Sequence, residues 1–134
     1  MPRLVYADAS ALVKLVIDEA ESEALLRFVS DEVSPASSVV AAVEVPRAVQ
    51  RAGEPPAAVE RANRLVEEID LVGLDANVIA GARSVVPAAV RSLDAIHIAS
   101  ALALGDELSA FVVYDRRLQR AAEDAGLTAI APGT

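Results

Sequence analysis

The sequence predicts an α/β fold in which a parallel sheet is covered by helices on both faces. Short apolar runs alternate along the chain with segments of helical spacing, as is typical of parallel strands joined by right-handed crossover helices. The first run, residues 4–7, is apolar on both faces, which indicates a strand buried on both sides. We expect a single domain, residues 1–134, because a chain of this length can bury about two-thirds of its unfolded surface.

In the first half of the chain, one strand and four helices follow the opening strand. Helices are predicted over residues 10–17, 21–29, 39–51 and 57–69, with a strand over residues 33–36. Pro35 suits the end of a strand or the edge of a sheet, because proline cannot donate a ladder hydrogen bond. Ser37 and Ser38 offer an N-cap for the third helix, and Gly53 ends it. Pro55-Pro56 opens the fourth helix.

In the second half, strands and helices continue to alternate. Strands are predicted over residues 71–74, 110–114 and 127–130, and helices over residues 76–85, 92–105 and 118–125. Asp75 caps the first of these helices and Pro87 ends it, while Gly126 ends the last. The helix over 92–105 is apolar on nearly every side, so we expect it to lie deep in the domain.

The composition excludes several classes of function. The chain has no cysteine, so it holds no disulfide or thiolate metal site, and a reducing, cytoplasmic setting is expected. No signal peptide and no apolar run of bilayer length is present, so we expect no membrane association. A net charge of −8 disfavours binding nucleic acid through a broad basic surface, unless bound cations or gathered arginines reverse the local potential.

Four acids stand in apolar surroundings, where an unpaired carboxylate is costly: Asp8, Glu44, Asp94 and Asp115. Each has a plain structural explanation, since Asp8 and Asp115 can cap helices, Glu44 can be an exposed helix position, and Asp94 can favour a helix dipole. If the four converge, their repulsion calls for a hard divalent cation such as Mg²⁺ or Mn²⁺. Such a site can hydrolyse a phosphodiester, so convergence predicts a nuclease.

Other polar residues near these acids have two interpretations each. His97, the only histidine, is more simply explained as a packed and hydrogen-bonded side chain than as a general base. Ser10 either supports Asp8 or caps a helix. Arginines that could contact phosphate flank two of the acids: Arg91, Arg116 and Arg117. Arg47 and Arg51, on the same helix face as Glu44, could also grip phosphates, or they could be solvated side chains.

Four parts of the sequence together match a known family. They are Asp8-Ala9-Ser10, Glu44 in a helix after Ser38, the segment 93–102 (LDAIHIASAL) and the segment 113–118 (VYDRRL). With these motifs, essentially the whole chain resembles the PIN domain, and particularly the ribonuclease toxins of VapBC toxin-antitoxin pairs.

The resemblance implies a three-layer α/β/α sandwich with a central parallel sheet and an Mg²⁺- or Mn²⁺-dependent site that cleaves RNA. It implies catalytic roles for Asp8, Glu44, Asp94 and Asp115, metal binding by Asp8, Asp94 and Asp115, and support from Ser10. It also implies a homodimer and a small VapB-type antitoxin whose tail lies over the site. Two residues depart from the family pattern: Val113 replaces a frequent Thr or Ser, and Pro46 lies inside the Glu44 helix, where it removes a backbone hydrogen bond.

The sequence therefore predicts an endoribonuclease that acts as a toxin. The alternative is a catalytically weak PIN-fold module that only binds RNA or protein, and the complete set of acids favours the enzyme. A phosphotransfer receiver would need a lysine near the end of its last strand, whereas the only lysine is Lys14. A haloacid-dehalogenase-type phosphatase would need an aspartate at the position of Ser10.

Overall fold

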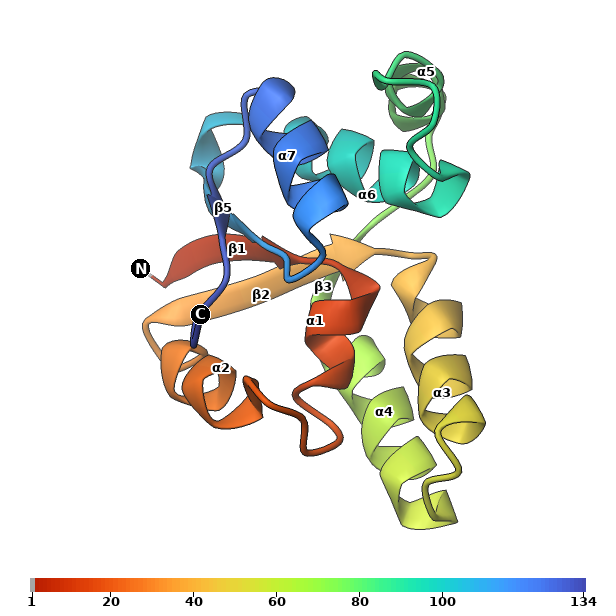
Figure 1. The fold of residues 1–134 in the computed structure, drawn as a ribbon, viewed down its shortest axis with the longest axis vertical. Coiled ribbons are helices and arrows are strands. Elements are labelled where there is room, and N and C mark those ends of the chain that lie inside the picture. The colour runs from red at the N-terminus through yellow and green to blue at the C-terminus, as the bar shows by residue number, and fades with distance from the viewer. Residues whose placement is uncertain (1) are drawn as a thin grey trace.

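A computed structural model describes residues 2–134 and contains a parallel sheet between two layers of helices (Figure 1). The strands are β1 (Arg3–Ala7), β2 (Val33–Ser38), β3 (Asp70–Val72), β4 (Leu108–Val112) and β5 (Ala129–Ile130). Their order in the sheet is β3-β2-β1-β4-β5, and every pairing is parallel. The predicted three-layer α/β/α class with a central parallel sheet is confirmed.

The helices divide between the two faces of the sheet (Figure 1). One layer holds α1 (Ala9–Val13), α2 (Ser22–Phe28), α3 (Ala41–Arg51) and α4 (Pro56–Glu68). The other holds α5 (Ala76–Arg83), α6 (Ser92–Ala103) and α7 (Arg116–Asp124), with the short 3₁₀ helix η1 (Gly105–Glu107) after α6. Each layer has its own apolar core against the sheet.

Strand β1 lies at the centre of the sheet and is buried on both faces, as predicted. Val5 and Ala7 pack into the core beneath α1, α3 and α4, whereas Tyr6 packs into the core beneath α6 and α7. This division follows from the alternation of side chains along a strand. The chain runs from β1 to β2 on one side, while β4 pairs with the other side of β1. The carboxyl end of β1 is therefore a topological switch point, where ligands bind in open parallel sheets.

Several local expectations were wrong. Ser37 and Ser38 lie within β2 and do not cap α3, which begins after Val40 without a side-chain cap. Ser37 instead donates to the carbonyl of Ala7 at 2.7 Å and ties β2 to β1. Helix α1 ends at Val13 in turns rather than continuing to residue 17.

Helix α6 is less buried than its composition predicted. Its inward face is closed, but Leu93 is 46% exposed and Leu102 is 44% exposed. Helix α5 packs beside α6 and covers only part of its outer surface. No helix within residues 2–134 combines the length and apolar character that crossing a bilayer requires.

Candidate active site

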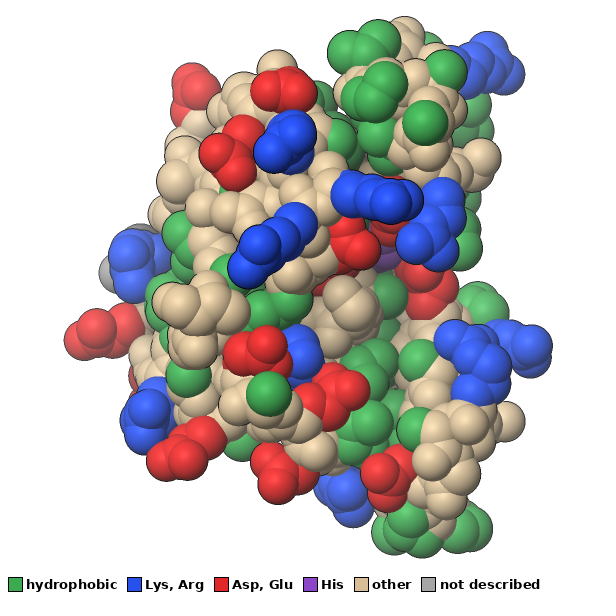
Figure 2. All heavy atoms as spheres, viewed as in Figure 1, with side chains coloured by type: hydrophobic (Ala, Val, Ile, Leu, Met, Phe, Trp, Pro, Cys, Tyr) green, Lys and Arg blue, Asp and Glu red, His purple; other side chains and the backbone are tan. Residues whose placement is uncertain are grey.

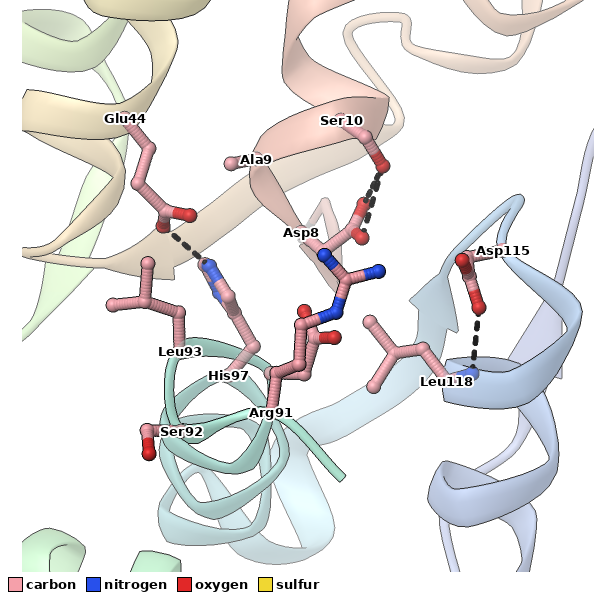
Figure 3. Close-up of a pocket in the computed structure, with 11 residues that line it drawn as sticks. Asp8, Ala9, Ser10, Glu44, Arg91, Ser92, Leu93, His97, Asp115 and Leu118 are labelled. Carbon is pink, nitrogen blue, oxygen red and sulfur yellow. Dashed lines mark hydrogen bonds and ion pairs between the residues drawn. The ribbon is translucent and has the colours of Figure 1, made fainter. Parts of the chain in front are cut away.

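The four acids line one cavity of about 400 Å³ at the carboxyl ends of β1 and β4. They come from four different places in the fold: the end of β1, helix α3, helix α6 and the turn before α7. The cavity is also lined by Ala9, Ser10, Arg91, Ser92, Leu93, His97 and Leu118 (Figure 3). The structure thus brings together four acids that are far apart in the sequence, which is the condition on which the nuclease prediction depends.

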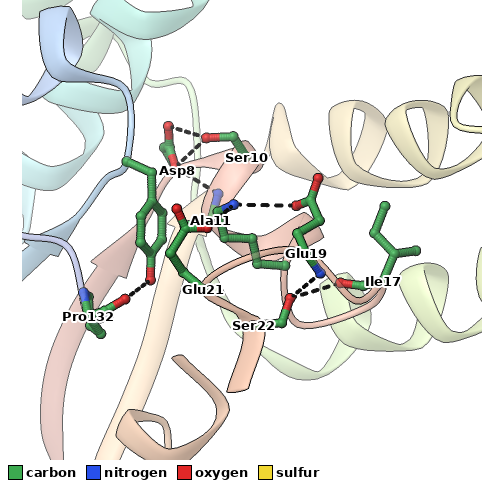
Figure 4. Close-up of polar contacts among 10 residues, drawn as sticks. Asp8, Ser10, Ala11, Ile17, Glu19, Glu21, Ser22 and Pro132 are labelled. Carbon is green, nitrogen blue, oxygen red and sulfur yellow. Dashed lines mark hydrogen bonds and ion pairs between the residues drawn. The ribbon is translucent and has the colours of Figure 1, made fainter. Parts of the chain in front are cut away.

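Asp8 follows β1 directly and is 4% exposed. It caps α1, because its Oδ1 accepts a hydrogen bond from the backbone N–H of Ala11 at 2.9 Å (Figure 4). Ser10 donates to the same carboxylate. Burial raises the pKa of Asp8, and the hydrogen bond from Ala11 partly opposes that rise. Asp8 therefore caps α1 and also lines the cavity, so the two interpretations of this residue are compatible.

Asp94 lies in the first turn of α6 and is half-buried. Burial raises the pKa of its carboxyl, and the charges of Asp115 and Glu44 raise it further. The nearby Arg91 guanidinium acts in the opposite direction. Burial and two neighbouring acids thus raise the cost of ionising Asp94.

Glu44 reaches the cavity from α3, which lies across the sheet from α6, the helix that carries Asp94. Its Oε1 lies 2.7 Å from Nε2 of His97, which is 1% exposed (Figure 3). Nδ1 of His97 lies 2.6 Å from the hydroxyl of Tyr6. The interpretation of His97 as a packed, hydrogen-bonded side chain is confirmed, and α3 runs from Ala41 to Arg51 despite Pro46.

Asp115 is an exposed residue that caps α7, since its Oδ1 accepts from the N–H of Leu118 at 2.9 Å. It does not end a strand as predicted, because β4 stops at Val112 and two residues intervene. One of them, Val113, is fully buried in the core beneath α6 and α7. As a valine, it has no hydroxyl to offer Asp115.

The arginines fall into two groups. Arg91 lines the cavity of the four acids. Arg116 and Arg117 line a second cavity of about 450 Å³ with Arg120, between α7 and residues 87–90. Figure 2 shows Lys or Arg side chains beside a hollow that contains acidic side chains and the edge of the single histidine. Positive charge is thus gathered near the acids despite the negative net charge.

The chemistry of the donor set suits a hard divalent cation, because the four acids present only carboxylate oxygens to the cavity. Within residues 2–134, no three acidic or histidine side chains already form a shell around one point. The acids therefore line an open cavity as they stand.

The contact that sequence reasoning missed is the one from Tyr6. This residue sits inside an apolar run, so nothing in its spacing indicated that its hydroxyl faces the only histidine. The one available signal was the pairing of a buried tyrosine two residues before Asp8 with a histidine one turn after Asp94.

Comparisons with known proteins agree with this geometry. Residues 5–124 match the PIN domain family model. The chain is 39% identical over 134 residues to Ribonuclease VapC47 of Mycobacterium tuberculosis, covering 97% of this chain and 98% of that relative. It is 39% identical over 128 residues to Ribonuclease VapC46 of the same species, covering 96% and 97%. Ribonuclease VapC35 from that species is 37% identical over 134 residues, covering 97% and 98%. The chain therefore belongs to the PIN-domain family, as a member of the VapC type.

Proposed function

We propose that the chain is a divalent-metal-dependent endoribonuclease and the toxin of a toxin-antitoxin pair. The observation that carries this proposal is the convergence of Asp8, Glu44, Asp94 and Asp115 on one cavity at the switch point of the sheet. The similarity to proteins named Ribonuclease VapC along nearly the whole chain supports the same activity.

In this proposal Asp8, Asp94 and Asp115 hold Mg²⁺ or Mn²⁺, and Glu44 completes the acidic site. The ion would lower the pKa of a water and neutralise charge on the phosphodiester. Ser10 orients the carboxylate of Asp8 by donating to both of its oxygens. Burial raises the pKa of Asp8 and Asp94, and neighbouring acids add to the rise, so a positive charge in the cavity would favour both ionised carboxylates.

The RNA strand would meet positive charge both in the acidic cavity and in the neighbouring cavity beside α7. Arg91 lies in the acidic cavity and would contact a phosphate there. Arg116 and Arg117 line the adjoining face of α7 and would contact the strand farther along. Such contacts position a nucleic acid without reading its sequence.

We further propose two protein partners and a cytoplasmic site of action. The first partner is a second copy of the chain, which would cover the apolar groove between α5 and α6. The second is a VapB-type antitoxin that offers a basic residue to the acidic cavity. Both follow the resemblance to VapBC toxins, and the exposed apolar side chains beside α5 support the first.

The proposal is tested by RNA cleavage with Mg²⁺ or Mn²⁺, comparing the parent with Asp8→Asn and Asp94→Asn. We expect both variants to lose at least about a hundredfold in kcat/KM, because each removes a charge that the site requires. Glu23→Gln is the matched control, since Glu23 is exposed on α2 and pairs with Arg27 at 2.9 Å. Cleavage by the two aspartate variants at the parental rate would refute the enzyme.

A further inference from the structure

We propose that Tyr6 and His97 are positioning residues that hold the carboxylate of Glu44 in the active site. The inference rests on the proposed function, because it assigns roles around the same acidic cavity. The chain of contacts runs from the Tyr6 hydroxyl to Nδ1 of His97 at 2.6 Å, and from Nε2 to Oε1 of Glu44 at 2.7 Å.

Glu44 needs such a partner because of where it comes from. It projects from α3, on the opposite side of the sheet from α6, and its side chain is 23% exposed. A free glutamate side chain samples many rotamers. The contact with His97 fixes one carboxylate oxygen, and Oε2 accepts no side-chain hydrogen bond within residues 2–134. The second oxygen is thus left for the cavity (Figure 3).

The other end of the chain of contacts is rigid. Tyr6 is fully buried in β1, and its ring stacks on Phe111 with centroids 5.3 Å apart and planes 5° apart. His97 meets the edge of Tyr6 with centroids 5.8 Å apart. Because both rings are buried and in contact, the position of His97 is set by β1 and α6 together.

The arrangement also selects one tautomer of His97. An ionised Glu44 can only accept, so Nε2 must carry a proton. Nδ1 is then left without a proton, so it accepts a hydrogen bond from the Tyr6 hydroxyl at 2.6 Å. A neutral imidazole with its proton on Nε2 satisfies both neighbours.

Two of the three linked elements also position other acids of the cavity, since Asp8 directly follows β1 and Asp94 lies on α6. Tyr6 lies two residues before Asp8 on β1, and His97 lies one turn after Asp94 on α6. The contacts therefore fix Glu44, which comes from α3, relative to the segments that place Asp8 and Asp94. Asp8, Asp94 and Asp115 hold the ion in the proposed function, but the negative charge of Glu44 in the same cavity also attracts it, so the position of Glu44 affects metal affinity.

Two measurements test the inference without RNA. In NMR spectra of ¹⁵N-labelled protein, the one histidine gives a single set of ring signals, and we expect the Nε2–H tautomer. The Nδ1–H tautomer would overturn the inference. Calorimetric titration with Mn²⁺ should give about tenfold weaker binding for Tyr6→Phe than for the parent. The control is Tyr114→Phe, which removes the phenol that donates to the Pro132 carbonyl at 2.8 Å and should leave binding unchanged.

A matched pair at His97 separates positioning from packing. His97→Gln can still reach Glu44 with an amide N–H, whereas the shorter His97→Asn reaches only toward Tyr6. We expect Gln to keep Mn²⁺ affinity within about threefold and Asn to lose about tenfold or more. Equal losses in both variants, or none in either, would refute the positioning role. If the parent binds Mn²⁺ with these dependences but cuts no RNA, the proposed function fails and this inference stands.

Discussion

Ser10 donates its hydroxyl to both carboxylate oxygens of Asp8, at 3.1 Å to Oδ1 and 3.0 Å to Oδ2. Burial raises the pKa of Asp8, and the hydrogen bond from Ser10 lowers it. The hydrogen bond therefore favours the charged carboxylate that a metal ion requires. We expect Ser10→Ala to weaken Mn²⁺ binding about tenfold, measured by calorimetry. Ser10→Thr keeps the hydroxyl and should bind as the parent does. Equal affinities for all three proteins would mean that Ser10 contributes nothing to the site.

The ionised carboxylate of Asp94 should destabilise the metal-free protein in a pH-dependent way, first because it is partly buried and second because other acids lie nearby. Because the pKa of Asp94 is raised on folding, its favourable contribution is complete below the unfolded pKa and is lost as pH rises through the folded pKa. Asp94→Asn has no carboxyl to ionise, so its stability does not fall in this pH range for that reason. We expect the variant to melt higher than the parent at neutral pH in chelator, with the difference shrinking toward pH about 4.

The control for this experiment is Glu23→Gln, which removes an acid from the first turn of α2 outside the cavity. It should not raise the melting temperature at any pH, because Glu23 is exposed and paired with Arg27. A melting difference between Asp94→Asn and the parent that does not change with pH would show that ionisation of Asp94 is not its cause.

The sequence allowed the fold and the approach of the acids to be predicted because both depend on local patterns. Residues 4–7 are apolar on both faces, which is typical of a strand inside a covered parallel sheet. Asp8 comes directly after that strand, so its place at the carboxyl edge follows from the chain direction alone. Asp115 was placed near the same edge by the same reasoning, although β4 ends sooner than predicted.

What could not be predicted depends on partners distant in the sequence. The Tyr6–His97 contact joins residues separated by 91 positions, and helical spacing does not tell which ring nitrogen faces which neighbour. Serine is a residue type that often caps helices, yet the hydroxyl of Ser37 donates to the Ala7 carbonyl of a neighbouring strand. The exposure of Leu93 likewise depends on how much of α6 the short helix α5 covers.

The groove between α5 and α6 should mediate self-association. It is about 370 Å³ in volume and is lined by Leu74 and Ile79, which are 40% and 42% exposed. We expect Ile79→Glu to convert a dimer into a monomer in light scattering, because a charge there would be buried against a second copy. Leu26→Glu, at a 55% exposed leucine on α2, is the control and should stay dimeric. A monomeric parent protein would exclude this interface.

The arginines on α7 should bind the RNA strand without taking part in the reaction. We expect Arg117→Ala to raise KM a few-fold at low salt with little change in kcat, since Arg117 lines a cavity separate from the acids. Loss of one phosphate contact should reduce the slope of log affinity against log salt by about 0.7 for a single strand. Arg64→Ala, at an exposed position on α4, is the control and should leave KM and the salt slope unchanged. An unchanged slope in Arg117→Ala would place the strand elsewhere, because an arginine that contacts phosphate must release counterions when RNA binds.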